Sequence, residues 1–356
     1  MMLLVFSGLL AFLVSMAPAA RGESPASHRD GRGARLARHD DREYREYLRE
    51  EQRSQPGCIA RRMQLDFHHG LPGQAPSRFV LASVADQQTE APVLGLGADD
   101  FVVQEGATRC ETINALPALY PIAILVDTSG AARPQFTQMR TAVRQFVSRL
   151  SGREVALYTF GDRAFRVSDF TLDTGQLERA VDQLFAVPDG ESHVLDAVIE
   201  AGRDIRRREP AVAMIVIVSA GSNDQSNRSP REVFEPVLAS RSILHIVETR
   251  AIGASGRLGN VRGRRNFTTD RAAEAALGLQ ELLQGLVNQT RGAYDRIFSV
   301  GGYHASLDAL QHRLAAELII EYAASAVDSP ASLRIGTRVP GGVVRAVGLE
   351  PGRRRP

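Results

Sequence analysis

The sequence has 356 residues, of which 44% are hydrophobic, enough to bury the cores of two or three domains. Its 43 basic and 41 acidic residues give a formal net charge of +2. This balance argues against a nucleic acid or an anionic membrane as the main partner. We therefore expect a globular protein that does not bind nucleic acid.

Residues 1–20 have the pattern of a secretory signal peptide. An apolar run from Leu3 to Val14 precedes small residues at Ala17-Pro18-Ala19. The run is short for a bilayer span, which needs about 20 apolar residues. No Lys or Arg precedes it, which leaves an uncleaved membrane anchor or a misassigned start codon as the alternatives. We expect an exported protein, periplasmic, cell-surface or secreted, with a membrane partner only if this segment stays uncleaved.

Residues 21–57 are dense in Arg, Asp and Glu and poor in large apolar side chains. Such a stretch cannot offset its ordering entropy by burial. It is expected to be a flexible charged linker.

Residues 58–117 change to short β-like segments separated by Gly, Pro and Asp, which predicts a small β-sandwich module. Its two cysteines, Cys58 and Cys110, either form a disulfide in an exported protein or stay as two buried thiols. We expect strands at Met63–Phe67, Phe79–Ala85 and Phe101–Gln104.

Residues 118–316 alternate apolar strand-like segments with helical patterns. This alternation predicts an α/β fold, a mostly parallel sheet with helices on both faces. The strands are expected at 122–126, Val155–Phe160, Ala213–Ser219, Ile243–Glu248 and Tyr294–Phe298, with a short antiparallel strand at Ala164–Val167. The helices are expected at Gln135–Leu150, Thr174–Phe185, Ser192–Arg208, Pro230–Ser240 and Ala272–Thr290.

The first strand runs directly into Asp127-Thr128-Ser129-Gly130-Ala131. A carboxylate and a hydroxyl thus stand where a buried strand ends, the edge at which open α/β sheets bind ligands. This segment resembles the first metal-site loop of von Willebrand factor A (VWA) domains, Asp-x-Ser-x-Ser, with Ala131 in place of the last serine. Segments along the rest of the chain resemble the VWFA-related acidobacterial domain family, in which a small β module precedes the VWA domain. In the small β module, the matching positions are Val93, Gly95, Leu96, Asp100, Phe101, Val103, Glu105 and Gly106. The later segments are Phe160-Gly161-Asp162-Arg163, Phe170-Thr171-Leu172-Asp173, Ser192-His193-Val194-Leu195-Asp196-Ala197, Ser219-Ala220-Gly221-Ser222-Asn223-Asp224 and Thr290-Arg291-Gly292-Ala293-Tyr294.

The resemblance implies a Rossmann-like VWA fold with a site for Mg²⁺ or Mn²⁺, hard ions that take oxygen ligands. In the family, the first loop supplies an Asp and two Ser, the second a Thr and the third an Asp. Here the matching oxygen ligands are Asp127, Ser129 and Ser192, while Ala131 and Ala220 have no oxygen to give. We therefore expect a degenerate site with weak metal binding or no cofactor.

Two alternatives remain for these loops. Glu191 or Asp224 could replace a lost metal ligand. Otherwise Asp127 and Ser129 serve as loop formers that cap the helix after them.

No nucleophile elbow, phosphate-binding loop or zinc-protease helix occurs in the sequence. Ser192, His193 and Asp196 could suggest a triad, but a helix beginning at Ser192 turns His193 about 100° from the other two. We predict no catalytic residue and no enzymatic activity.

Residues 317–350 contain further strand patterns at Glu317–Ala323, Leu333–Val339 and Val343–Val347. They either pair with residues 58–117, which makes the VWA domain an insertion in a composite sandwich, or add a hairpin to the VWA sheet. Residues 351–356 are expected to be a disordered tail.

These features together predict a non-enzymatic exported VWA-domain protein. It would bind another protein, or mediate adhesion, through the loops around Asp127, Ser192 and Ala220. The alternative is a scaffold whose VWA loops are vestigial and whose β-sandwich makes the contacts.

Overall fold

The computed structural model describes residues 62–65, 77–249, 267–324 and 333–351. The predicted signal peptide, the charged linker and Cys58 lie outside these ranges, as do residues 352–356 of the predicted tail. Among the helices within these ranges, none has the length and apolar character needed to cross a membrane.

The largest sheet in the described part of the chain has six strands in the order β11-β10-β9-β6-β7-β8. Neighbouring strands are parallel except for β8, which runs antiparallel to β7 at one edge. This arrangement confirms the predicted fold class. The strands are β6 (Ile122–Val126), β7 (Val155–Phe160), β8 (Ala164–Thr171), β9 (Ala213–Ser219), β10 (Ser242–Thr249) and β11 (Ala293–Ile297).

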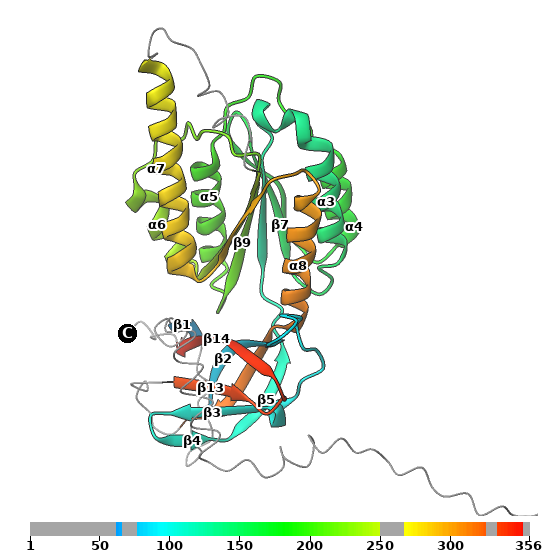
Figure 1. Ribbon diagram of the computed structural model, residues 1–356, viewed down its shortest axis with the longest axis vertical. Helices are drawn as coiled ribbons and strands as arrows, with labels where there is room; N and C mark the ends of the chain where they lie inside the picture. Colours follow the sequence, from blue (N-terminus) through cyan, green and yellow to red (C-terminus); the bar gives the residue numbers. More distant parts are fainter. Residues whose placement is uncertain (1–61, 66–76, 250–266, 325–332, 352–356) are drawn as a thin grey trace, which may run out of the picture. The chain divides into compact units, whose positions relative to one another are not determined.

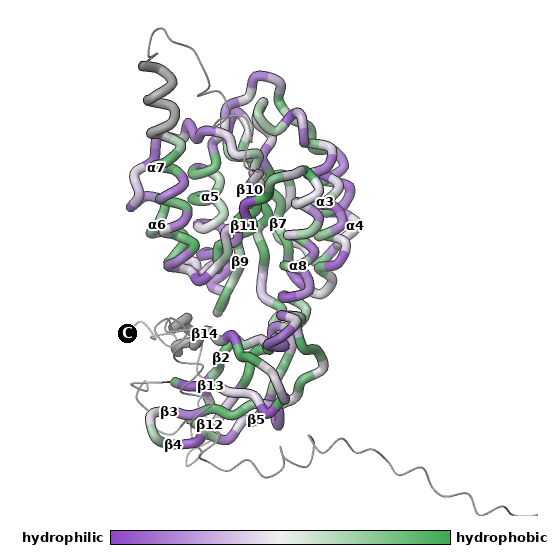
Figure 2. Tube along the Cα trace, viewed as in Figure 1, coloured by the Kyte–Doolittle hydropathy of each residue, from purple (hydrophilic) through white to green (hydrophobic). Residues whose placement is uncertain are grey.

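Helices cover both faces of this sheet (Figure 1). On one face lie α3 (Phe136–Ser148), α4 (Thr174–Asp182) and α8 (Gly302–Ala316). On the other lie α5 (Val194–Arg207), α6 (Pro230–Ala239) and α7 (Phe267–Thr290). Figure 2 shows the apolar residues concentrated in the central strands and the hydrophilic ones on the outer sides of the helices.

Strand β6 shows why an unbroken apolar run belongs in the centre of such a sheet. Ile122, Ile124 and Val126 pack in the core on the α3 side. Ala123 and Leu125 pack in the core on the α5 side, and all five residues are fully buried. A strand covered on both faces needs apolar side chains at every position. The run ends at Asp127, so the first polar side chain lies at the carboxyl edge of the sheet.

A β-sandwich precedes and follows this domain in the sequence, and its two sheets are built from both ends of the chain. One sheet has the order β1-β14-β2-β12-β5 and the other β13-β3-β4. Strands β4 and β5 were not among the predicted ones. The strands are β1 (Arg62–Leu65), β2 (Ser77–Asp86), β3 (Phe101–Glu105), β4 (Thr108–Cys110), β5 (Thr112–Pro117), β12 (Leu318–Ala323), β13 (Leu333–Thr337) and β14 (Gly342–Pro351).

The three strands after α8 all lie in this sandwich. Strand β12 pairs with both β2 and β5, β13 pairs with β3, and β14 pairs with β2. The segment from β6 to α8 is therefore inserted between two hydrogen-bonded neighbours, β5 and β12. Cys110 is buried in the sandwich core, where its Sγ lies 3.8 Å from the carbonyl oxygen of Thr108.

The sandwich also buries an ion pair that the sequence did not indicate. Arg78 Nη1 donates to Glu105 Oε1 at 2.5 Å, and the two side chains are 3% and 1% exposed. The Tyr322 hydroxyl donates to the same carboxylate oxygen at 3.0 Å. The charge of Glu105 is therefore neutralised inside the core by an arginine on β2.

Candidate functional site

Asp127 lies at the carboxyl edge, fully buried, with neutral hydrogen-bond donors around its carboxylate. Oδ1 accepts from the Ser129 backbone N–H at 2.9 Å. Oδ2 accepts from the Ala220 N–H at 3.0 Å, the Ser222 hydroxyl at 2.9 Å and the Ser219 hydroxyl at 3.4 Å. Asp127 thereby joins the first loop, after β6, to the third loop, after β9.

Ser222 is the site residue that sequence reasoning missed. Its hydroxyl donates to Asp127 and accepts a hydrogen bond from the Ser129 hydroxyl at 3.3 Å, so the three side chains form a continuous chain. Gly221 has a φ of +74°, and a Cβ on it would lie 2.6 Å from the Thr249 carbonyl oxygen. Only glycine fits this tight turn, which reverses the loop after Ala220 and returns Ser222 toward Asp127. The signal available in the sequence was a second hydroxyl just beyond that glycine.

The second loop, residues 183–193, is fixed to the first by backbone hydrogen bonds. The Val187 N–H donates to the Thr128 carbonyl oxygen, and the Gly130 N–H to the Gly190 carbonyl oxygen, both at 2.8 Å. A Cβ at Gly130 would lie 2.6 Å from the Pro188 carbonyl oxygen, so this close approach requires glycine. The two loops therefore form one connected surface.

Ser192, at the end of the second loop, is 2% exposed. Its hydroxyl oxygen has no hydrogen-bond partner among the described residues. The backbone of Ser192 forms a bridge with Asp224, and its carbonyl oxygen accepts from the Gln225 N–H at 2.7 Å. Ser192 thus connects the second loop to the third through its backbone, with its side chain held buried.

The third loop also supplies the cap of α5. His193, the residue before the helix, makes no side-chain cap hydrogen bond. Instead Asp224 Oδ1 accepts from the Leu195 N–H at 3.2 Å and from the Ser226 hydroxyl at 2.8 Å. Burial raises the pKa of Asp224 above its usual value. The carboxylate considered as a replacement ligand is therefore engaged at the helix terminus, and the other candidate, Glu191, is exposed.

The helix begins at Val194, two residues later than predicted, and this changes the geometry around His193. The expectation that His193 points away from Asp196 was wrong: His193 Nδ1 lies 3.5 Å from Asp196 Oδ2. Because Ser192 precedes the helix, the helical-wheel argument did not apply to it. In the described structure its hydroxyl makes no hydrogen bond to His193, so the three side chains are not linked as a triad.

Ser129 precedes the 3₁₀ turn η2 (Gly130–Gln135) and makes no side-chain cap hydrogen bond to it. Of the two alanines at expected ligand positions, Ala131 is exposed and Ala220 is buried in the core on the α3 side. Because both residues are alanines, these two positions provide no side-chain oxygen in addition to Asp127.

The donor set does not fit a tightly held divalent cation. Such an ion needs several oxygen ligands with enough negative charge to replace its hydration shell. Asp127 supplies one carboxylate, and the other oxygens that bond to it are neutral serine hydroxyls. Within the described residues, no three His, Cys, Asp or Glu side chains are grouped so that they could hold a metal ion.

A second carboxylate ends the neighbouring strand β10. Glu248 is in register with Ser219 and accepts a hydrogen bond from the Tyr294 hydroxyl at 2.6 Å. Burial raises the pKa of Glu248, and the nearby charge of Asp127 adds to this effect. The Tyr294 hydrogen bond and the nearby charge of Arg296 oppose this increase.

Exposed aromatic side chains surround this edge. Phe185, in the second loop, is 72% exposed although its neighbour Leu184 is buried in the core. Phe298, directly after β11, is 65% exposed, and Phe165, opposite Thr159 near the end of β7, is 51% exposed. The loops thus combine a polar centre with apolar side chains in solvent.

Residues 122–223 match the family model of the von Willebrand factor type A domain. This part of the chain is a VWA domain. This range runs from the start of β6 into the third loop, so it includes Asp127, Ser192 and Ser222. No curated protein sequence matches the chain.

Several solved structures are similar to part of this chain. The conserved hypothetical protein BatB from Bacteroides thetaiotaomicron is 14% identical, with 56% of this chain and 98% of that chain covered and a TM-score of 0.41. Proximal thread matrix protein 1 from the mussel byssus, with a zinc-occupied MIDAS motif, is 13% identical over 63% of this chain and 50% of that chain, with a TM-score of 0.42. A von Willebrand factor type A protein from Catenulispora acidiphila is 11% identical, with 80% of this chain and 68% of that chain covered and a TM-score of 0.41.

Proposed function

We propose that this protein is a non-enzymatic, exported binding protein whose VWA loops around Asp127, Ser192 and Ala220 bind another protein without requiring a metal. The observation that carries the proposal is Phe185, which is 72% exposed on a loop fixed by backbone hydrogen bonds. Exposed aromatic side chains on a rigid support are the usual anchors of protein interfaces. A VWA fold is consistent with a role in protein interaction or adhesion.

Metal independence is supported by the hydrogen bonds that already order the loops. Asp127 links the first and third loops through Ala220 and Ser222, and the second loop is bonded to Thr128 and Gly130. Binding surfaces that are ordered beforehand lose less entropy when a partner docks. A cation would add little order here, so we propose that no cofactor is required and that Mg²⁺ or Mn²⁺ binds weakly at most.

We propose that the protein has no catalytic activity because of the burial and hydrogen bonding of its polar side chains. The carboxylate of Asp127 is buried and accepts from neutral donors, and the Ser192 hydroxyl makes no hydrogen bond to a base within the described structure. A nucleophile needs an adjacent base in hydrogen-bond reach to become reactive. Export is proposed on the apolar pattern of residues 1–20.

A capture experiment with the full chain tests the binding surface. Wild type, Phe185→Ser and the control Leu277→Ser would each be immobilised in buffer with EDTA. Leu277 is 58% exposed on α7, so it matches the loss of exposed apolar area. We expect a partner that binds wild type and Leu277→Ser and is lost with Phe185→Ser. Equal capture by all three, or capture that needs a divalent metal, would contradict the proposal.

The scaffold alternative has its own supporting observation in the sandwich, where Leu94 is 62% exposed and Leu116 is 55% exposed. In that case the sandwich makes the contacts. A Leu94→Ser variant would then lose the partner while Phe185→Ser keeps it.

A further inference from the structure

Strands β8 and β5 each lie at the end of a sheet, with a neighbouring strand on one side. Strand β8 ends the VWA sheet, and β5 ends the larger sheet of the sandwich. An edge of this kind presents backbone N–H and C=O groups that can pair with a strand of another chain. The two strands differ in what protects them from such pairing.

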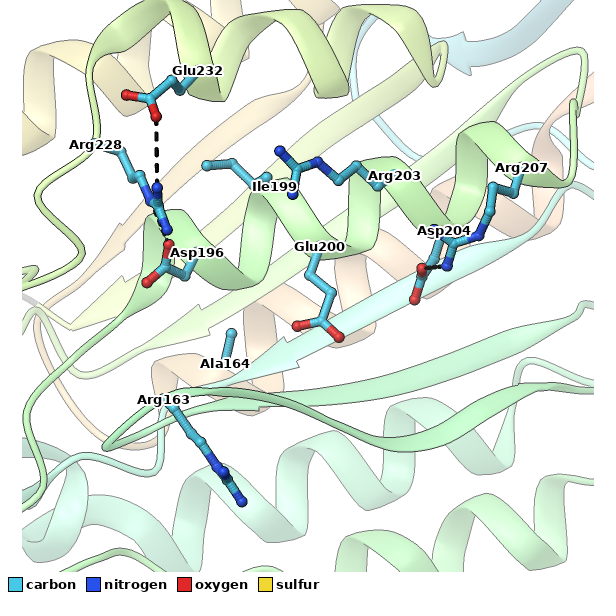
Figure 3. A pocket seen from close by; sticks show the side chains of 10 residues that line it. All are labelled: Arg163, Ala164, Asp196, Ile199, Glu200, Arg203, Asp204, Arg207, Arg228 and Glu232. Carbon is cyan, nitrogen blue, oxygen red and sulfur yellow. Dashed lines mark hydrogen bonds and ion pairs between the residues drawn. The ribbon is translucent and has the colours of Figure 1, made fainter.

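Strand β8 is protected by irregular pairing and by charge. Its register with β7 shifts at two places, and Arg166 in this strand donates to Asp204 of α5 at 2.9 Å. Figure 3 shows further charged side chains in the groove between α5 and the β7–β8 turn, among them Asp196 and Arg228, which are paired at 2.6 Å. Bulges and charged side chains make an edge strand a poor template for another strand.

Strand β5 lacks the charge. Its residues, Thr112–Pro117, include no Asp, Glu, Lys or Arg. Ile113 is 50% exposed and Leu116 is 55% exposed, so apolar side chains reach solvent along this strand. The register shift beside Tyr322 of β12 leaves Ile113 outside the regular pairing. An exposed apolar edge strand is an expected site of association between chains.

The pairing with β12 determines which backbone groups of β5 face outward. The Ala118 N–H donates to the Glu317 carbonyl oxygen at 3.0 Å, and this bond continues the antiparallel register of β5 and β12. In such a ladder only every second residue bonds to the partner strand. The second and fourth residues before Ala118 therefore bond to β12, while Ala115 and Pro117 direct their backbone polar groups away from it.

Neither of these two outward-facing residues has a free N–H group. The side-chain Oδ1 of Asn114 accepts from the Ala115 N–H at 2.9 Å. Pro117 has no N–H, and its carbonyl oxygen accepts from the Leu119 N–H at 3.1 Å. A strand that approached β5 would therefore find no free donor at either position.

We propose that Asn114 and Pro117 close the β5 edge against addition of a strand from a second copy of this chain. Asn114 occupies one outward donor with its own side chain, and Pro117 removes the next. Within sheets, proline is tolerated at edge positions where the missing N–H faces away from the neighbouring strand. This role is separate from the proposed function of the VWA loops. It also limits the scaffold alternative, because a partner that contacts Leu116 would bind side chains and not the strand backbone.

The test compares the self-association of the full chain and its variants by sedimentation velocity over a range of concentrations. Asn114→Val/Pro117→Val changes two exposed residues and restores both outward donors. Two added backbone hydrogen bonds in an interface should tighten self-association about tenfold or more relative to wild type. Amide hydrogen exchange at residues 115 and 117 should slow in the associated form, because pairing occupies these donors.

A control variant separates strand pairing from a general gain in surface hydrophobicity. Thr137→Val/Gln138→Val adds two exposed valines to α3, where no strand edge is present, and should associate as wild type does. Both double variants change exposed side chains, so both should melt close to wild type. If the β5 double variant melted lower, Asn114→Val alone would free the Ala115 N–H and should still associate more tightly than wild type. Unchanged association of the β5 variants, an equal increase in the control, or association without slower exchange at residue 115 would overturn the proposal.

Discussion

The sandwich and the VWA domain each bury a carboxylate, and they stabilise it in opposite ways. Glu105 in the sandwich is bonded to the guanidinium of Arg78 and to the Tyr322 hydroxyl. Asp127 at the carboxyl edge is bonded to backbone N–H groups and serine hydroxyls. A carboxylate paired with arginine is electrically neutral, whereas one held by dipoles keeps its negative charge. The first arrangement neutralises the carboxylate with one side chain, and the second uses it to join the first loop to the third.

The largest expected effect comes from breaking the charged pair. Arg78→Met leaves Glu105 buried without its cation, which should lower the free energy of unfolding by about 3–5 kcal/mol. Urea unfolding of the full chain measures this value. Arg345→Met, which changes an exposed arginine on β14, should cost less than about 0.5 kcal/mol. If Arg78→Met lowered the free energy of unfolding by less than about 1 kcal/mol, the ion pair would not be required for the stability of the fold.

Removing the other buried carboxylate should cost less. Asp127→Ala leaves its neutral donors without an acceptor, but the hydroxyls of Ser219 and Ser222 can turn toward other oxygens. We expect a loss of about 2–3 kcal/mol in the same urea experiment. The exposed Asp189 of the second loop provides the control, and Asp189→Ala should stay near wild type. A loss for Asp127→Ala larger than that for Arg78→Met would reverse the comparison.

Ser222→Ala tests one hydrogen bond of the Asp127 cluster. The variant loses the hydroxyl that joins Ser129 to Asp127, and the expected cost is about 1 kcal/mol. The adjacent Asn223 is exposed, and its change to alanine should have no comparable effect. Equal stability of the two variants would show that Ser222 does not hold the first and third loops together.

The smallest effect is a pH dependence at Glu248. Burial raises the pKa of Glu248 in the folded state, so the folded protein binds the proton more tightly than the unfolded chain does. Its contribution to stability is therefore full below the unfolded pKa and is lost as the pH rises through the folded pKa. Glu248→Gln keeps an acceptor for Tyr294 and should be slightly more stable than wild type at pH 7 but not at pH 4. A variant that is less stable at pH 7 would contradict this reading.

The sequence predicted the parts of the fold that depend on regular patterns. The unbroken apolar run of β6 located the central strand and placed Asp127 at its end, and the alternation of strands and helices predicted the α/β class, which the structure confirms. A residue at the end of a fully buried strand has a position fixed by the strand itself. The hydrogen-bond partners of such a residue depend on the conformations of the loops, which the spacing of residues in the sequence does not reveal.

The missed features all depend on such loop geometry or on contacts between distant segments. Ser222 reaches Asp127 because Gly221 turns the third loop, and α5 begins late because Asp224 caps it from that loop. The pair of Arg78 and Glu105 joins residues on β2 and β3, in different sheets of the sandwich. A charged residue in a strand is usually exposed, so the alternation pattern gave no reason to expect this burial.

The most direct test of a metal-independent carboxyl edge is thermal melting in EDTA and in about 10 mM Mn²⁺, where binding to the folded state raises stability by mass action. Wild type would be compared with Ala131→Ser/Ala220→Asp, which restores the two missing oxygen ligands. We expect wild type to gain less than about 0.4 kcal/mol, the value for a dissociation constant equal to the metal concentration, and the double variant to gain clearly more. A wild-type gain of about 2.7 kcal/mol, as for a site at a hundred times its dissociation constant, would contradict the account.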